Sequence, residues 1–218
     1  SKVKTSEKLF TRQDVGLPAE GFVFCCFNNH YKISPTTFAG WMRILKAVDG
    51  SVLWLPATSD NAVKNLKKEA KKNGIDENRL IFAPRLDLNE DHLGRQKLAD
   101  LFLDTLPYNA HTTASDALRM GVPVLTCIGK AFSARVAASL LKAVNLPEMI
   151  TTTQEQYERL AIELATSPEK IKIIKNKLAN NLPTAPLYDT PLFTKNLEAA
   201  YQVMYEKYQN DLNFDDIE

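Results

Sequence analysis

Residues 100–127, "DLFLDTLPYNAHTTASDALRMGVPVLTC", hold two apolar runs on either side of a polar loop and a helical pattern. The runs at 100–105 and 123–127 are short and mostly apolar, which is typical of strands in a sheet that is covered on both faces. Residues 112–120 predict a helix, and Gly121 follows as a typical helix-ending residue. The stretch therefore predicts a strand–helix–strand unit of a parallel sheet.

The same alternation extends towards the N-terminus. Further strands are predicted at 22–27, 51–55 and 79–83, and further helices at 35–48, 61–72, 90–98 and 132–143. Ser34-Pro35 is a typical helix start, because serine caps and proline suits the first helical position. We predict an α/β fold, with a Rossmann-like parallel sheet of about five to six strands and helices on both faces.

The pattern changes after Pro147, where helices at 154–166, 168–180 and 191–208 follow one another without predicted strands. Tyr201, Tyr205 and Tyr208 share one face of the last helix, and we expect that face to pack on the core. The predicted organisation is a lead-in at 1–20, a Rossmann-like domain at 21–150, and C-terminal helices at 151–218 that pack on the same domain.

The charge balance argues against nucleic acid as a partner, since 27 basic residues face 26 acidic ones. No apolar run reaches the roughly 18 residues of a membrane span, and no signal peptide is recognisable. The three cysteines lack disulfide or zinc spacing, which favours a reducing compartment, and we expect a cytoplasmic location. The chain does not begin with methionine, so we expect further residues upstream of Ser1.

Three polar loops follow predicted strands, at 28–34, 84–95 and 106–113, and they contain all three histidines: His30, His92 and His111. Ligands of open α/β sheets bind outside the carboxyl ends of the strands, where these loops meet. The loops are therefore the expected binding site.

At the third loop a helix begins near His111, Thr112 and Thr113. The first N–H groups of a helix lack internal partners and carry the positive end of its dipole, so they bind phosphate readily. Asp116, one turn further on, would face a ribose. Taken alone, the stretch favours a plainer interpretation, in which threonine caps the helix.

The other two loops add a cation and a planar pair. Lys32 follows its strand closely enough to reach the same crevice, although a lone lysine is usually solvated. His92 and Arg95 share a helix face and suit a nucleotide base, or they form an ordinary surface pair. The sequence lacks GxGxxG, GxxxxGK[ST], GxSxG, HExxH and CxxC, so no metal site is predicted. The residues alone predict a crevice for a phosphate or a sugar nucleotide.

Five segments together resemble the C-terminal catalytic lobe of O-linked N-acetylglucosamine transferases. They are "FVFCCFNNHYKISP" (22–35), "SVLWL" (51–55), "RLIFAP" (79–84), residues 99–126, and "SARVAASLL" (133–141). The resemblance covers about residues 10–208 and is to glycosyltransferase family 41, in particular its bacterial, tetratricopeptide-repeat-bearing and SPINDLY-type members. It implies one lobe of a glycosyltransferase B fold, a UDP-GlcNAc donor, and no metal or other cofactor.

The resemblance also implies roles for individual residues. Lys32 would contact the diphosphate, His111, Thr112 and Thr113 would line it, and Asn29 stands where the transferase has a polar residue near it. Asp116 would bind the ribose, His92 and Arg95 would lie against the uracil, and the main chain near Leu86 and Asp87 would read its edge.

Two differences between this sequence and the family limit what the resemblance implies. Asn89 stands where the animal enzymes have a lysine, which leaves the donor open between UDP-GlcNAc and the GDP-fucose of O-fucosyltransferase relatives. The family's N-terminal lobe and repeats, which bring the polypeptide acceptor and a catalytic histidine, have no counterpart here, and His30 lies in the wrong motif.

The sequence therefore predicts the donor-binding half of a protein O-glycosyltransferase acting on Ser/Thr, inactive by itself, with an exposed lobe face that favours self-association. The alternatives are a non-catalytic nucleotide- or protein-binding module of the same fold and, third, a sugar-nucleotide epimerase.

Overall fold

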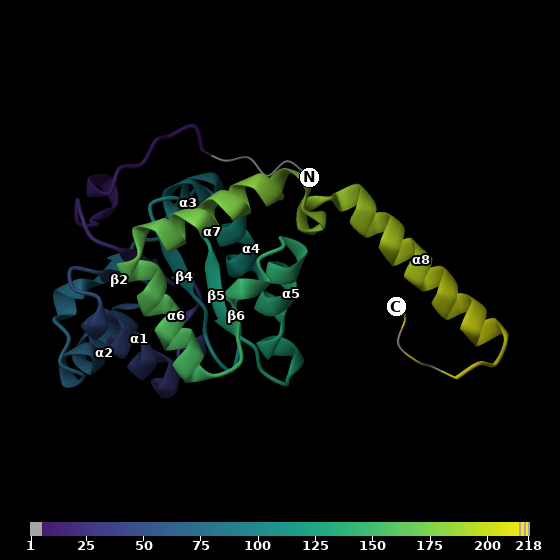
Figure 1. Cartoon of the computed structure of the whole chain (residues 1–218), viewed down its shortest axis with the longest axis horizontal. Coiled ribbons are helices and arrows are strands. Elements are labelled where there is room, and N and C mark those ends of the chain that lie inside the picture. The colour runs from purple at the N-terminus through teal and green to yellow at the C-terminus, as the bar shows by residue number, and fades with distance from the viewer. Residues whose placement is uncertain (1–5, 214, 216, 218) are drawn as a thin grey trace.

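The computed structural model describes residues 6–213, 215 and 217, and its centre is a single parallel sheet (Figure 1). Six strands run in the order β3-β2-β1-β4-β5-β6. Their bounds are β1 Val23–Cys25, β2 Val52–Pro56, β3 Leu80–Ala83, β4 Leu101–Leu103, β5 Val124–Cys127 and β6 Ile150–Thr151. The predicted α/β fold is confirmed, and β6 is the strand that the sequence pattern did not show.

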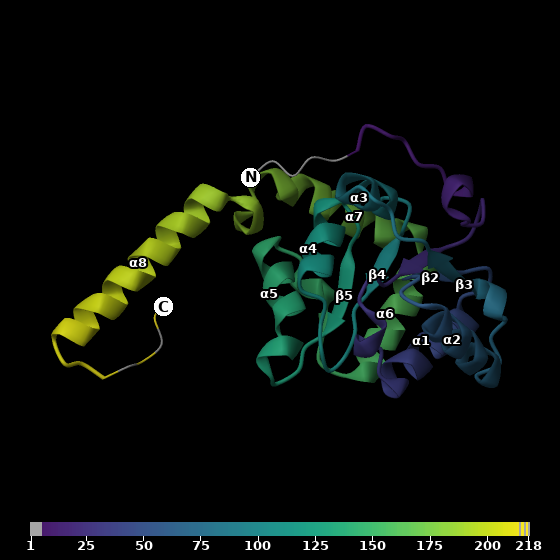
Figure 2. The ribbon, with the colours of Figure 1, turned by 180° about the vertical axis from the view of Figure 1, so that it is seen from behind.

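Helices α1 to α5 lie between successive strands, and α6 to α8 follow β6. Their bounds are α1 Pro35–Ala47, α2 Asp60–Lys72, α3 Asn89–Gln96, α4 Thr112–Arg119, α5 Val136–Ala143, α6 Gln154–Thr166, α7 Pro168–Asn181 and α8 Thr190–Gln209. Figures 1 and 2 show α1 and α6 side by side on one face of the sheet, with α4 and α5 on the other. Helices on both faces explain why the strands are continuously apolar.

Along the chain, β2 and β3 are added to one side of β1, whereas β4, β5 and β6 are added to its other side. Phe24 of β1 pairs with Leu53 on one side and Leu101 on the other. Loops that leave β1 and β4 therefore open side by side at the carboxyl edge, which is where ligands bind in such sheets.

Buried aromatic residues link the helices to the end of β4. The Trp41 indole of α1 donates to the Tyr157 hydroxyl at 3.2 Å, and that hydroxyl donates to the Asp104 carbonyl at 3.0 Å. Both side chains are almost completely buried. The exit of β4 is thus anchored from the α1–α6 face.

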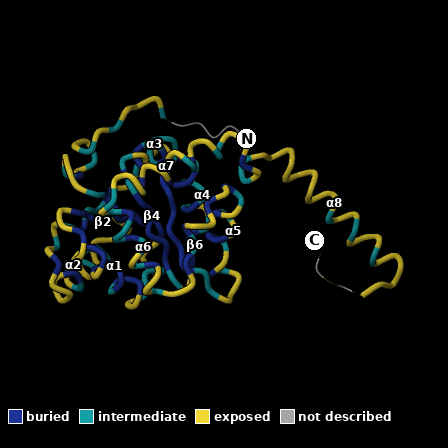
Figure 3. The backbone as a smooth tube through the Cα atoms, viewed as in Figure 1, coloured by how far each residue is buried: buried dark blue, intermediate teal, exposed yellow. Residues whose placement is uncertain are grey.

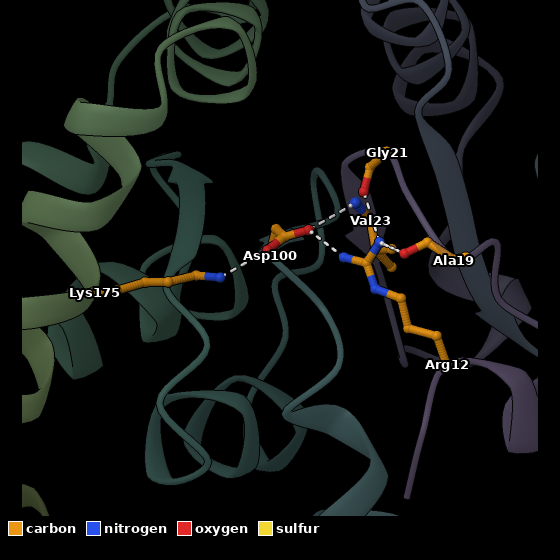
Figure 4. Close-up of polar contacts among 6 residues, drawn as sticks. All are labelled: Arg12, Ala19, Gly21, Val23, Asp100 and Lys175. Atoms are coloured by element: carbon orange, nitrogen blue, oxygen red, sulfur yellow. Dashed lines mark hydrogen bonds and ion pairs between the residues drawn. The ribbon is translucent and has the colours of Figure 1, made fainter.

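The described part of the expected lead-in, residues 6–20, is docked against the domain. Figure 4 shows the Arg12 guanidinium donating to the Gly21 carbonyl at 2.8 Å and to Asp100 at 3.2 Å. Asp100 also accepts the Val23 N–H at 3.0 Å and the Lys175 amine at 2.7 Å. One carboxylate therefore joins the lead-in, β1, β4 and α7 at the amino edge of the sheet. Residues 1–5 of the lead-in lie outside the described residues.

The C-terminal helices differ in how they pack. In α6 and α7, residues such as Tyr157, Ala161, Ile171 and Leu178 are buried against the domain. In contrast, α8 extends away from the body, and none of its residues is buried (Figures 1 and 3). Tyr205 is 64% exposed and Tyr208 is 68% exposed.

The expectation that this last helix packs on the core is therefore wrong for the chain as it stands. The i, i+4, i+7 spacing of its tyrosines shows that they share a face, but the spacing carries no information about what covers that face. Across the described residues, no helix combines the length and apolar character needed to cross a bilayer.

Candidate functional site

An open pocket of about 510 Å³ lies at the carboxyl ends of β1, β2 and β3. Residues from the three strand exits and from α3 line it: Phe27, Asn29, Pro56, Ala57, Thr58, Ala83, Pro84, Arg85, Leu86, Asp87, Asn89, His92 and Arg95. The pocket therefore contains half of the predicted site residues, namely Asn29, Leu86, Asp87, His92 and Arg95.

His92 and Arg95 form the deep wall of this pocket. The Arg95 guanidinium donates to His92 Nδ1 at 3.0 Å and to the Pro84 carbonyl at 2.7 Å. Both side chains lie against the Phe27 ring, with centroid distances of 5.2 Å for the imidazole and 5.9 Å for the guanidinium. They are indeed a pair, but not on the surface, because Arg95 is only 3% exposed.

These contacts fix the chemistry of the two residues. Burial and, to a smaller extent, the Arg95 charge together lower the pKa of His92 to about 4, so the imidazole is neutral at pH 7. Arg95 donates from its two terminal nitrogens to His92 and Pro84, so it holds the loop after β3 in place. Both ring nitrogens of His92 have protein partners, Nδ1 in Arg95 and Nε2 in the Gln96 amide at 3.2 Å, so a ligand would meet the imidazole ring and not a free nitrogen.

The second part of the site is the junction between β4 and α4. The Lys32 amine donates to the Asn109 carbonyl at 2.9 Å and lies 3.9 Å from the centroid of the Tyr108 ring. Asn109 is two residues before His111, the N-cap of α4. The structure thus brings Lys32 to the helix start, as the sequence predicted. Burial lowers the pKa of Lys32, while the negative charge of Asp104 opposes that shift.

No side chain caps α4, contrary to the plainer interpretation of the threonines. The N-cap residue is His111, and it makes no side-chain capping hydrogen bond. Thr113 donates its hydroxyl proton to Asn28 Oδ1, so that hydroxyl is not a donor for a ligand. Thr112 is exposed at the helix start. A phosphate at this end would be bound mainly by backbone N–H groups.

Asn28 is a site residue that the sequence reasoning did not select. Its amide donates to the Thr105 hydroxyl at 2.7 Å, while its carbonyl accepts from Thr113. It is 1% exposed and joins the loop after β1 to both ends of the β4–α4 loop. The available signal was its place directly after the buried run 22–27.

Two buried polar atoms at the junction have no hydrogen-bond partner among the described residues: Asn109 Oδ1 and His111 Nε2. Buried polar atoms are usually satisfied, by protein, water or a ligand. Both atoms belong to residues of the β4–α4 junction, where Lys32 also lies, so the junction holds polar groups that a bound molecule could satisfy.

Asp116 lies one turn into α4 and is partly buried. Burial raises its pKa and the Arg119 charge opposes the rise. Together with Lys32, His111, Thr112 and Thr113, Asp116 lies outside the lining of the pocket itself. The candidate site therefore has two parts, the pocket at β1–β3 and the junction at β4–α4, which the loop 28–32 connects.

Within the described part of the chain, no group of three or more His, Cys, Asp or Glu side chains is arranged to hold a metal ion. All three cysteines are buried and free, and burial raises the pKa of the Cys25 and Cys127 thiols.

Comparison with known proteins gives consistent results. The family model described as "Glycosyl transferase family 41" matches residues 1–197. The chain is 31% identical over 216 residues to a UDP-N-acetylglucosamine–peptide N-acetylglucosaminyltransferase of Caenorhabditis elegans, covering 99% of this chain and 19% of that protein. It is 37% identical over 195 residues to the Arabidopsis thaliana protein named "Probable UDP-N-acetylglucosamine--peptide N-acetylglucosaminyltransferase SEC", covering 89% and 20%. The chain thus spans about a fifth of the length of these relatives.

Solved structures show the same fold. An O-GlcNAc transferase mutant of Thermobaculum terrenum superimposes with a TM-score of 0.81 at 33% identity, covering 86% of this chain and 37% of that one. The Anabaena protein HepE in complex with UDP and glucose gives a TM-score of 0.59 at 18% identity, covering 88% and 51%, and shares the fold.

The chain has a six-stranded parallel sheet with a two-part site at its carboxyl edge. Together with these relatives, this structure identifies a glycosyltransferase, and the chain forms one lobe of the B-type fold. The chain belongs to glycosyl transferase family 41.

Proposed function

We propose that this chain is the donor-binding half of a protein O-glycosyltransferase that transfers N-acetylglucosamine from UDP-GlcNAc to Ser/Thr of polypeptides. The observation that carries the proposal is the Lys32 amine, held 2.9 Å from the Asn109 carbonyl beside the uncapped start of α4. The names of the relatives from Caenorhabditis elegans and Arabidopsis thaliana support this donor and a peptide acceptor.

The base occupies the pocket at β1–β3 in this proposal. The uracil lies against His92, and the backbone near Leu86 and Asp87 reads its edge. A neutral imidazole with a pKa near 4 serves as a flat, uncharged wall at pH 7. Arg95 contributes by fixing the Pro84 carbonyl.

The diphosphate and ribose occupy the junction. Lys32 and the N–H groups at Thr112 and Thr113 bind the diphosphate, with Asn29 and His111 beside it, and Asp116 binds the ribose. An ammonium next to a helix N-terminus is a common anion site, because the dipole and the open N–H groups act together.

The mechanism follows from where charge develops. Breaking the glycosidic bond leaves negative charge on the departing UDP, and Lys32 with the α4 N–H groups stabilises it at that position. Loss of one such donor typically costs about 10²–10³ in rate. We propose that these groups replace a metal and that no cofactor takes part. The acceptor and its general base come from parts of the protein beyond this chain.

The proposal includes a cytoplasmic location, which the three free, buried cysteines support. It includes a polypeptide acceptor and a UDP-sugar as partners, with neither nucleic acid nor membrane. It also includes self-association of the isolated chain through its exposed lobe face.

The test is calorimetric titration of the chain with UDP, GDP and ADP. Preferential binding of UDP supports the proposal, whereas preferential binding of GDP favours the GDP-fucose alternative. A chain that binds none of them at about 1 mM, a free energy of only about −4 kcal/mol, contradicts donor binding and favours a protein-binding module.

A further inference from the structure

The carboxylate of Asp104 lies beneath the junction and has no place in the donor contacts described above. It is 1% exposed at the exit of β4. Its Oδ1 accepts the Thr105 N–H at 2.8 Å and the Ala110 N–H at 2.6 Å, and its Oδ2 accepts the Thr126 hydroxyl at 2.6 Å. Three donors to one buried carboxylate is an arrangement that needs an explanation, because burying such a group is costly.

The two N–H groups belong to the two ends of one loop. Thr105 is the first residue after Asp104, and Ala110 directly precedes the N-cap of α4. A single oxygen atom therefore closes residues 105–110 into a ring. Within it, the Thr105 hydroxyl donates to the Tyr108 carbonyl at 2.7 Å and the Asn109 amide donates to the Thr105 carbonyl at 3.0 Å.

This closed loop carries the parts of the site that contact a diphosphate. The Asn109 carbonyl on it holds the Lys32 amine, and its last residue leads into α4. Asn28 links the loop at Thr105 to the first turn of α4 at Thr113. A shift of Ala110 would move both the amine and the helix start.

We propose that Asp104 is a positioning residue for the diphosphate: by accepting the N–H groups of Thr105 and Ala110, it fixes the loop that presents Lys32 and the start of α4. This inference rests on the proposed function and adds to it a residue that touches no substrate. Burial raises the pKa of Asp104 to about 7, and its three donors and the Lys32 charge keep the pKa from rising further, so these partners favour the ionised form.

The test compares UDP with uridine, because only UDP uses the junction. Asp104→Ala removes the acceptor, and we expect it to weaken UDP binding at least about tenfold while uridine binding, followed by NMR, stays within about threefold. Asp104→Asn keeps an acceptor oxygen for both N–H groups, and its amide can donate to Thr126, so we expect UDP affinity within about threefold of the unaltered chain. Ser51→Ala is the matched control, since it removes another buried polar group at the opposite edge of the sheet.

Three results would overturn the inference. The first is a folded Asp104→Ala chain that binds UDP like the unaltered one. The second is equal loss of UDP and uridine binding in that folded chain, which indicates a general structural role. The third is a tenfold loss of UDP affinity in Asp104→Asn, which is informative even if the alanine variant fails to fold. Failure of the unaltered chain to bind UDP is a separate outcome that contradicts the proposed function itself.

Discussion

Lys32 and Asn109 are 77 residues apart in sequence, yet the amine of the first donates to the main-chain carbonyl of the second at 2.9 Å. The contact joins the loop after β1 to the loop after β4, at the point where the order of the strands in the sheet reverses. The Tyr108 ring lies 3.9 Å from the amine, so the ammonium is also placed over an aromatic face. The cation is thus already held beside α4 by the protein's own groups, which reduces the ordering cost of binding an anion there.

The hydrogen bonds of Asn28 with Thr105 and Thr113 should matter for stability as well as for the site. Asn28→Ala leaves the Thr105 and Thr113 hydroxyls without this buried partner, and we expect a loss of about 1–3 kcal/mol in the free energy of unfolding. Urea denaturation measures it. Asn29→Ala, at the exposed neighbouring position, is the control and should change stability by less than about 0.5 kcal/mol. Equal losses in the free energy of unfolding for the two variants would show that these hydrogen bonds do not stabilise the fold.

Asp100 should affect the stability of the fold but not nucleotide binding. Asp100→Ala removes the partner of Arg12, Lys175 and the Val23 N–H at the amino edge of the sheet (Figure 4). We expect unfolding to become easier by about 1–3 kcal/mol, mostly from the unsatisfied N–H, because partly exposed ion pairs contribute little. UDP affinity measured by calorimetry should not change. A marked loss of affinity would show that the two edges of the sheet are coupled.

His92 predicts a pH dependence of stability. Its pKa is about 4 in the folded chain and near 6.5 when unfolded, so between these values the unfolded state binds a proton that the folded state does not. The contribution of His92 to stability should therefore fall as the pH is lowered from about 6.5 towards 4.

His92→Gln cannot titrate, and its amide oxygen can still accept from Arg95. The fall in Tm between pH 7.5 and pH 5 should be smaller in this variant than in the unaltered chain. His30→Gln, at an exposed histidine, is the control and should keep the full fall. Identical pH profiles for all three chains would show that His92 titrates normally.

Removal of α8 should leave the domain intact. None of its residues is buried, so a chain ending at Asp189 loses little apolar burial. We expect a Tm close to that of the full chain and less self-association in sedimentation experiments, since Phe193, Tyr201 and Tyr205 are exposed. A large drop in Tm would show that α8 packs on the domain in solution.

The sequence predicted the elements whose signals are local. The continuous apolar runs around Phe24, Leu53 and Phe102 fixed the buried strands, and Ser34-Pro35 marked the start of α1, where the serine hydroxyl accepts the Thr37 N–H at 3.2 Å. The position of Lys32 near the start of α4 was also predicted, because the carboxyl ends of parallel strands share one edge of a sheet. β6 was missed because a strand of two residues is too short for a pattern.

Other features depend on tertiary contacts that no spacing reveals. Asn28 and Asp104 looked like ordinary polar residues at strand ends, and their importance comes from partners 77 and 22 residues away. Arg95 was correctly paired with His92, but the direction of its other donor, towards Pro84, depends on how the loop after β3 folds back. The packing of α8 could not be predicted, since an amphipathic pattern does not identify its partner.

The most direct test of the central claim is calorimetric titration of UDP into the unaltered chain, into Lys32→Ala and into Lys172→Ala, which removes an exposed lysine on α7. The account predicts that the unaltered chain and Lys172→Ala bind UDP with the same affinity, while Lys32→Ala shows no binding at about 1 mM nucleotide. Undiminished UDP binding by a folded Lys32→Ala chain would contradict the claim that this amine and the start of α4 hold the diphosphate.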